Sequence, residues 1–141
     1  MVKIYRGKPG WHIDKRRIII DTVFREGMVL PFPIKQVKVI DFSREGVDQA
    51  MAVGNHYHSK ESGRQEFFTV LGAPESSLCL SFRWRKAGQE KIEEKGLMNG
   101  DGVYVPPGYS HAFVPLMSGV KLLGLSNLPF RDEDDIADKL F

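Results

Sequence analysis

The sequence predicts an all-β protein, built as a sandwich or a closed barrel. Over most of the chain apolar residues alternate with polar ones at a period of two, which is typical of strands with one buried face. The alternating stretches are rich in Val, Ile, Phe and Leu, and turn-forming segments such as SREG, NGDG and PPGYS separate them. Many short strands at this spacing indicate a sandwich or a barrel. The 141 residues fit one domain spanning 1–141.

The pattern predicts eight strands and one short C-terminal helix. The helix is expected at Asp132–Leu140, inside the acidic tail 131–141, with Asp132 as its cap and Lys139 in its last turn. Residues 1–15 are poorly patterned and are expected to form an arm over the body or over a partner subunit. The strands are expected at Arg17–Val23, Lys35–Phe42, Ala50–His58, Glu66–Leu71, Leu78–Arg85, Gly102–Val105, Ala112–Leu116 and Val120–Asn127.

Composition excludes several classes of protein. A net charge of +2 without a long basic stripe argues against nucleic acid as a partner. No apolar run is long enough to span a membrane, and the N-terminus has no apolar core like that of a signal peptide, so a cytoplasmic protein is expected. The single cysteine, Cys79, rules out an internal disulfide and is expected to pack in a strand.

A pair of histidines forms the first candidate site, in the stretch GNHYHSKESGRQEFFTVLGA of residues 54–73. Because residues two apart in a strand point to the same face, His56 and His58 lie on one side, roughly 7 Å apart. If the strand that begins at Glu66 pairs antiparallel to theirs, its carboxylate arrives beside them. Imidazole and carboxylate ligands suit zinc, iron, manganese or nickel.

The register of this second strand is open. A shift by one residue would turn Gln65 inward in place of Glu66, and Gln is a poor transition-metal ligand. Glu61 also competes by its position, although it sits in a loop beside charged and polar residues and is expected to be solvated. An H-x-H pair by itself also occurs as a surface or packing feature.

A third histidine follows in NGDGVYVPPGYSHAF. Gly100 lies in a turn, Pro106 and Gly108 form a tight bend, and His111 is presented at the start of the next strand. The sequence therefore predicts a three-histidine site.

The two segments together resemble the two motifs of the cupin superfamily, over residues 50–115. The first motif reads G, five residues, H-x-H, three or four residues, E, six residues, G. Here seven residues separate His58 from Glu66, and Ala50 and Ala73 stand at the glycine positions. EFFTVL looks like the cupin E-x-F-x-V-L strand, which favours Glu66 over Gln65 as the inward residue.

The second cupin motif reads G, five residues, P, x, G, two residues, H, three residues, N, and matches from Gly100 through His111, with Pro115 at the last position. The resemblance implies a double-stranded β-helix, that is, a jelly-roll barrel. It also implies a divalent transition metal held by the three histidines and Glu66.

A narrower resemblance is to the cupins that act on bacterial sugar nucleotides, the epimerases and 3,4-ketoisomerases of keto-deoxy sugars. This resemblance rests on three segments, which are GNHYH, the bend PPGYSHAF and the C-terminal segment LSNLPFRDEDD. The epimerases have an R-G-x-H segment, and its arginine is missing here, where Val53–His56 stand. This resemblance implies an isomerase or epimerase of a nucleotide-linked sugar in surface-polysaccharide biosynthesis. Another metal-dependent cupin enzyme, such as a dioxygenase or lyase, and a non-catalytic sugar- or metal-binding cupin stay open, because fold does not choose among them.

Two mechanisms are compatible with these residues. In one, the metal held by the histidines and Glu66 polarises a substrate carbonyl, which eases removal of the neighbouring proton. In the other, His56 is the general base and a tyrosine the acid. Tyr57 faces away from His56 within its strand, so Tyr104 or Tyr109 is preferred, with Tyr104 as the first candidate.

Two further predictions concern binding. Arg83 and Arg85 point the same way from one strand and could grip the phosphates of a nucleotide sugar, although a charged outer face of the sheet is the favoured explanation. Exposed sheet edges have to be covered, and the arm at residues 1–15 could extend over a partner subunit. We therefore predict a homodimer.

Overall fold

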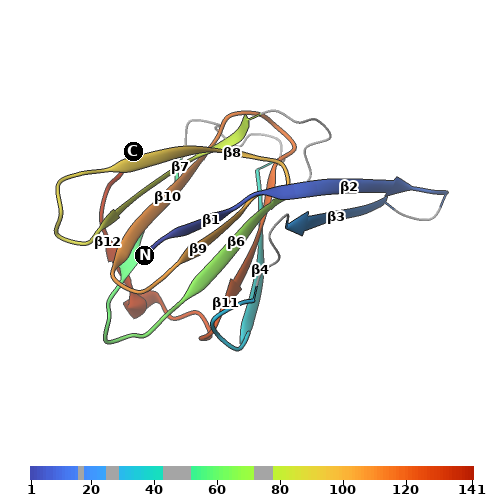
Figure 1. The fold of residues 1–141 in the computed structure, drawn as a ribbon. Helices are drawn as coiled ribbons and strands as arrows, with labels where there is room; N and C mark the ends of the chain where they lie inside the picture. The colour runs from blue at the N-terminus through green and yellow to red at the C-terminus, as the bar shows by residue number, and fades with distance from the viewer. Residues whose placement is uncertain (16–17, 25–28, 43–51, 72–77) are drawn as a thin grey trace.

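The computed structural model of the chain describes residues 1–15, 18–24, 29–42, 52–71 and 78–141. Within these ranges the secondary structure is almost entirely β (Figure 1). The elements are β1 (Lys3–Tyr5), β2 (Gly7–Ile13), β3 (Ile18–Phe24), β4 (Gln36–Asp41), β5 (Val53–His58), β6 (Glu66–Leu71), β7 (Leu78–Lys86), β8 (Glu93–Met98), β9 (Gly102–Val105), β10 (Tyr109–Pro115), β11 (Lys121–Ser126), η1 (Asp132–Asp134) and β12 (Asp135–Ala137).

Two antiparallel sheets of five strands form the body. The first sheet has the order β1-β9-β6-β11-β4, and the second has the order β12-β5-β10-β7-β8. Inward side chains of both sheets share one apolar core, in which the ring of Phe68 from β6 lies 5.0 Å from that of Phe113 on β10. Phe82 of β7 stacks on Phe113 at 4.9 Å. The two sheets therefore pack face to face, and the all-β prediction is confirmed.

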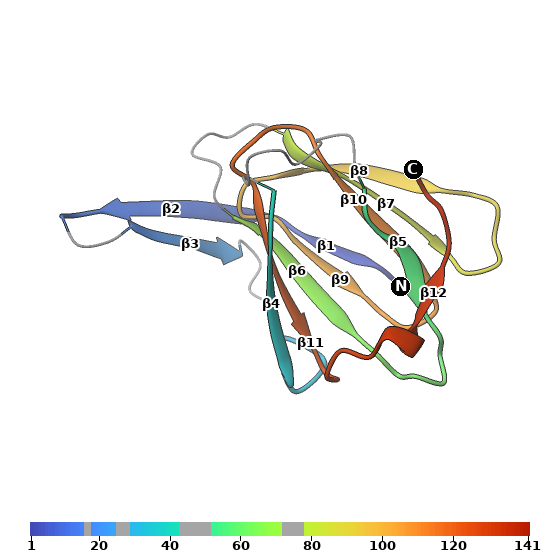
Figure 2. The same cartoon turned by 180° about the vertical axis from the view of Figure 1, so that it is seen from behind.

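The N-terminal residues divide between the body and a projecting hairpin. Lys3–Tyr5 add a strand to the edge of the first sheet, where Ile4 pairs with Val103. Gly7–Ile13 then pair with Ile18–Phe24 in a hairpin that extends away from the body (Figure 2).

The predicted C-terminal helix is wrong. Only Asp132–Asp134 form a single 3-10 turn, whose cap is Arg131 and not Asp132. The next three residues pair with β5 as an edge strand, with Asp135 opposite His58 and Ala137 opposite His56. Because this ladder satisfies backbone groups along β5, tertiary pairing prevails over the weak local preference of the acidic segment for helix.

Within the described part of the chain, no helix has the length and apolar character to cross a bilayer. β8 was not predicted because its sequence EEKGLM is polar at one end and exposed there, as an edge strand can be.

Cys79 is buried in the core, as predicted.

Candidate functional site

A bulge in β5 sets the position of the first histidine. His56 pairs with His111 of β10, and Gly54 pairs with Ala112, so Asn55 is an extra residue without a partner in the ladder. Gly54 and Asn55 both have positive φ, at 101° and 58°. A Cβ at Gly54 would lie 2.5 Å from the carbonyl oxygen of His111, so only glycine allows the two strands to approach this closely.

Three imidazoles and one carboxylate meet on the inner face of the two sheets. The ring of His56 lies 4.9 Å from that of His58 and 4.8 Å from that of His111. Glu66, at the start of β6, faces them from the first sheet, and one ligand atom from each of the four residues lies within 4.8 Å of the others. His58, Glu66 and His111 are buried, while the side chain of His56 keeps 21% of its surface exposed. His56 is therefore the member of the cluster that a ligand can reach.

Glu66 accepts contacts on both of its oxygens. Oε2 lies 3.1 Å from Nε2 of His58 and 3.1 Å from Nε2 of His111. Burial by itself raises the pKa of Glu66, but the hydrogen bonds from His111 and His58, with the charge of Lys38, outweigh it and hold the pKa well below its ordinary value. The cluster thus holds a buried carboxylate in its charged form.

Lys38 belongs to the cluster and was not predicted. Its Nζ lies 2.9 Å from Oε1 of Glu66 and 5.2 Å from the ring centre of Phe68. It comes from β4, two strands away from Glu66, and its side chain crosses β11 over Gly124, which pairs with both Lys38 and Phe68. A Cβ at Gly124 would lie 2.9 Å from two carbons of Lys38, so the missing side chain makes room for the lysine.

The C-terminal segment adds a second carboxylate. Asp135 places Oδ1 3.2 Å from Nδ1 of His58 and Oδ2 3.8 Å from Nδ1 of His56. The carbonyl oxygen of Asp134 lies 3.2 Å from Nδ1 of His58 as well. No local signal in the sequence identifies Asp135, because its place depends on the pairing of β12 with β5, nearly eighty residues earlier in the chain.

His56 is neutral over the ordinary pH range. Burial, followed by the charges of His111 and His58, lowers its pKa to about 3, and the opposing effect of Glu66 is smaller. Its imidazole is therefore free to accept a proton, although the low pKa makes it a weak base unless a partner stabilises the protonated ring.

The structure decides between Gln65 and Glu66. Glu66 points inward, while Gln65 accepts a hydrogen bond of 2.7 Å from the hydroxyl of Tyr104. Glu61, the other competitor, is exposed. Tyr104 pairs with Phe67 and alternates with the inward Val103 and Val105, so it lies on the other face of the first sheet from Glu66.

The prediction of Tyr104 as catalytic partner of His56 is therefore wrong for this arrangement. Phe32 stacks on its ring at 6.3 Å, and burial raises the pKa of its hydroxyl. These contacts make Tyr104 a structural residue of the outer face.

Arg83 and Arg85 hold the C-terminal residues and do not face the cluster. They pair with Ala112 and Ser110, on the outer face of the second sheet, whereas His111 pairs with Trp84 on the inner face. Arg85 forms a bidentate ion pair with Asp138.

Arg83 donates to the carbonyl of Leu140 at 3.0 Å and lies over the ring of Phe141. Across the same face, Oδ1 of Asn55 accepts from the backbone N–H of Leu140 at 2.8 Å. The predicted role of the two arginines in binding phosphate is not supported, because these charges are committed to the tail.

A cavity of about 270 Å³ lies between the N-terminal residues and residues of β7, β8 and β10. Trp84, the strand neighbour of His111, and Tyr109, two residues before it, line this cavity. Lys86 and Lys91 supply positive charge there, and Glu93 one negative charge. An aromatic wall beside cationic side chains suits a ring system that carries phosphate groups.

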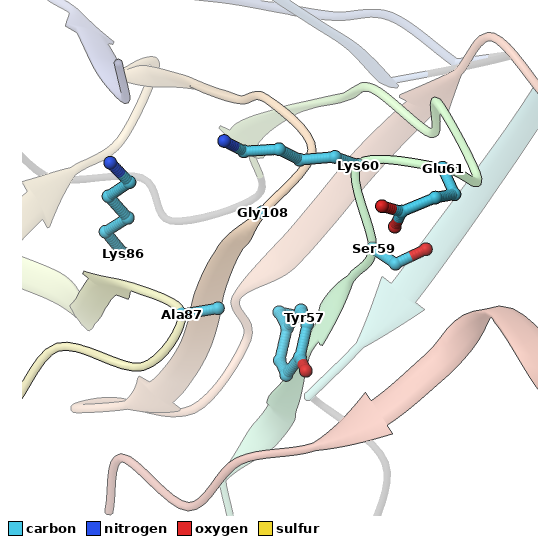
Figure 3. Close-up of a pocket in the computed structure, with 7 residues that line it drawn as sticks. All are labelled: Tyr57, Ser59, Lys60, Glu61, Lys86, Ala87 and Gly108. Carbon is cyan, nitrogen blue, oxygen red and sulfur yellow. The ribbon is translucent and has the colours of Figure 1, made fainter.

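A second cavity of about 270 Å³ lies elsewhere, where the loop after β5 meets the end of β7 (Figure 3). Tyr57, Lys60 and Lys86 are among its lining residues, as labelled in Figure 3. Tyr57 alternates with His56 and His58 along β5, so it belongs to the other face, as predicted.

The donor set suits a divalent transition ion in kind and in spacing. Three imidazoles and a carboxylate are frequent ligands of zinc, iron, manganese and nickel, and all four donors lie close enough to share one ion after small shifts. Against this, the ammonium of Lys38 already stands where a cation would bind Oε1 of Glu66.

Comparison with solved structures finds the same fold in enzymes of sugar nucleotides. A mutant of the QdtA 3,4-ketoisomerase from Thermoanaerobacterium thermosaccharolyticum, in complex with TDP, is 24% identical, with 97% of this chain and 87% of that chain covered and a TM-score of 0.64. WlaRA, a TDP-fucose-3,4-ketoisomerase from Campylobacter jejuni, is 17% identical, with 97% and 89% covered and a TM-score of 0.66. ChmJ, a 3'-monoepimerase from Streptomyces bikiniensis in complex with dTDP-quinovose, is 18% identical, with 96% and 68% covered and a TM-score of 0.67.

No protein-family model matches the chain, and no curated protein sequence matches it. The solved structures therefore establish the fold, which is the jelly roll that the cupin resemblance implied.

Proposed function

We propose that the protein is an isomerase or epimerase of a nucleotide-linked keto-deoxy sugar. The observation that carries the proposal is the cluster of His56, His58, His111 and Glu66 on the inner wall of a jelly roll that known 3,4-ketoisomerases share. A role in bacterial surface-polysaccharide biosynthesis follows from that substrate class, as does a cytoplasmic location, and both belong to the proposal.

His56 is the general base of the proposed reaction. It is the exposed member of the cluster and is neutral because its pKa is lowered to about 3. It takes the proton from the carbon next to the sugar carbonyl, and Asp135, 3.8 Å from Nδ1, stabilises the imidazolium that forms. The bond electrons move into the carbonyl, and protonation of its oxygen gives an enediol.

The enediol then leads to either product. In ketoisomerisation, the neighbouring hydroxyl loses its proton and the former carbonyl carbon gains one. In epimerisation, the proton returns to the same carbon from the opposite face, and the oxygen protonated in the first step loses its proton to restore the carbonyl. Neither route needs an oxidant or reductant.

Tyr109 replaces Tyr104 as the candidate acid. It lies on the same strand and face as His111, and it lines the same cavity as Trp84. The nucleotide would occupy that cavity, with its base against Trp84 and its phosphates toward Lys86 and Lys91. A Trp84→Ala variant should bind TDP at least ~10-fold more weakly, since a lost aromatic stack is worth about 1–3 kcal/mol. Isothermal titration with TDP measures this affinity. An unchanged affinity would show that the nucleotide does not bind in this cavity.

A metal-dependent reaction is the second candidate function. The grouping of four donors within 4.8 Å favours it. A divalent ion held by His56, His58, Glu66 and His111 would supply Lewis-acid polarisation of the carbonyl. This candidate includes other metal-dependent cupin enzymes such as a dioxygenase or lyase, and metal analysis of the purified protein tests it. A non-catalytic sugar- or metal-binding cupin remains if neither reaction is found.

A homodimer is also part of the proposal. Val37 and Val39 on the edge strand β4 are each 62% exposed and pair with Leu125 and Leu123 of β11 on the outer face of the first sheet. A second copy of the chain would cover this apolar edge.

Proton exchange tests the proposed reaction. The protein is incubated with TDP-4-keto-6-deoxyglucose in deuterated water, and the sugar is followed by NMR. We expect loss of the proton at carbon 3, with deuterium on carbon 4 of a 3-keto product or on carbon 3 of an epimer, and a loss of at least ~100-fold in rate for His56→Asn, the usual contribution of a general base. Tyr57→Phe, on the same strand but the other face, is the matched control and should retain the rate. Absence of both exchange and TDP binding in the folded protein would reject this function.

A further inference from the structure

Lys38 occupies the position of a cation within the histidine–carboxylate cluster. A metal bound by the cluster would need a lone pair from each imidazole and one from Glu66. In the structure, Nζ of Lys38 lies at hydrogen-bond distance from Oε1 of Glu66, at 2.9 Å, and the Lys38 side chain is 34% exposed while that of Glu66 is 2% exposed. The carboxylate charge is thus already balanced by an ammonium that belongs to the chain.

Two imidazoles contact the other oxygen of the same carboxylate. Nε2 of His58 and Nε2 of His111 both lie 3.1 Å from Oε2 of Glu66. Both oxygens of Glu66 therefore already have partners within the cluster. A metal ion bound to Glu66 would also stand beside the positive charge of Lys38, which opposes its binding.

The path of Lys38 to the cluster is built into the fold. Gly124 leaves open the space that the lysine stem crosses, since a Cβ there would lie 2.9 Å from Cγ and Cε of Lys38 and 3.2 Å from Cε1 of Phe68. The ring of Phe68 lies beneath the ammonium, at 5.2 Å from Nζ. An accidental surface lysine would need neither the glycine nor the aromatic support.

We propose that Lys38 is the resident cation of the cluster and that it excludes divalent metal ions, so that removing its charge converts the cluster into a metal site. The substituted site would take Zn²⁺ or another divalent transition ion through His56, His58, Glu66 and His111. Competition between Lys38 and a metal ion can be measured without any sugar substrate. The Zn²⁺ titration can therefore fail while the proton-exchange experiment succeeds, and the reverse also holds.

Titration of the metal-free protein with Zn²⁺ at fixed pH, by calorimetry, tests the proposal in the absence of any substrate. Wild type should bind Zn²⁺ at the cluster weakly, and Lys38→Met should bind one ion per chain at least ~10-fold more tightly. Adding Glu66→Gln to Lys38→Met should remove the gain, which assigns it to the cluster. Lys121→Met, which removes a lysine from the outer face of β11, is the matched control and should behave as wild type.

Gly124→Ala provides an independent variant that leaves every ligand and Lys38 in place. The added methyl presses on the lysine stem, so Zn²⁺ affinity should rise in the same direction as for Lys38→Met, by less. The absorption of bound Co²⁺ gives a second readout of coordination by imidazole. Tight binding of one Zn²⁺ per chain by the folded wild type would overturn the proposal. Equal Zn²⁺ affinity in wild type and both variants would overturn it as well. The wild-type measurement is decisive even if a variant does not fold.

Discussion

Gly54 is expected to be the most sensitive glycine of the site. Replacing it with alanine adds a Cβ 2.5 Å from the carbonyl oxygen of His111 and 3.0 Å from Cα of Ala112, at a φ of 101°. An L residue at such a backbone conformation costs about 1–3 kcal/mol. Because the nearest atoms belong to backbone and cannot rotate away, overpacking adds about 1–3 kcal/mol. The expected loss of unfolding free energy is therefore roughly 2–6 kcal/mol.

Gly63 offers the matched control for Gly54→Ala. Its φ is also positive, at 66°, but a Cβ there would meet nothing within 4 Å. Gly63→Ala should therefore cost only the backbone strain of about 1–2 kcal/mol, reduced by up to about 1 kcal/mol because alanine restricts the unfolded chain.

Thermal unfolding followed by circular dichroism measures the difference between the two variants. For a chain of this size 1 kcal/mol shifts the midpoint by roughly 3–4 °C, so Gly54→Ala should lower it by roughly 6–24 °C, and Gly63→Ala should lower it by less than Gly54→Ala does, up to about 8 °C. Urea unfolding at 25 °C gives the free energies directly. Equal losses in the two variants would refute the close approach of β5 to β10 on which the placement of His56 depends.

Three further predictions concern the acid, the tail and the assembly. Tyr104→Phe should lose only the hydrogen bond on the outer face and keep kcat within about twofold, whereas Tyr109→Phe should lower kcat by roughly 10²-fold or more, measured on the keto sugar. The hydrogen bond from Arg85 lowers the pKa of Asp138, and burial opposes this effect. The contact therefore stabilises the fold above about pH 4, and its contribution is lost as pH falls through the lowered pKa. Urea unfolding between pH 6 and pH 2 should show this acid loss, and an Asp138→Asn variant should lack it. Val39→Asp should convert the proposed dimer into monomers in light scattering, and a wild type that is already monomeric would contradict the dimer.

The strands and the three histidines could be predicted because their signals are local. Period two places His56 and His58 on one face, and the turn before His111 gives the next strand its direction. The bounds predicted for Glu66–Leu71 and Gly102–Val105 agree with the structure. The EFFTVL resemblance favoured Glu66 over Gln65, but periodicity left both open, and the register of β6 against its neighbours places Glu66 inward.

Lys38 and Asp135 could not be predicted because each reaches the cluster through long-range pairing. Lys38 arrives across an intervening strand, through the space above Gly124, and nothing in the sequence QVKVID distinguishes it from a lysine on an exposed edge. Asp135 lay within a segment whose acidic residues favoured a helix. Both errors have the same cause, since sequence periodicity indicates the face of a strand but not which strand lies next to it.

The loop between the H-x-H pair and Glu66, longer here than in the usual cupin motif, contributes directly to the site. It contains Arg64, whose side chain is only 1% exposed and donates to Oγ of Ser126 at 2.9 Å and to the carbonyl of Leu128 at 3.1 Å. The same guanidinium contacts the carbonyl of Pro129 and the carboxylate of Asp134.

Arg64 therefore fixes the segment that leads into Asp135. A buried guanidinium is stable only where several acceptors surround it, so the segment from Leu128 to Asp134 must follow this path for Arg64 to be satisfied. The extra loop residues that depart from the motif thus bring the C-terminal carboxylate to His56 and His58. For this chain, the departure from the family pattern is part of how the site is assembled.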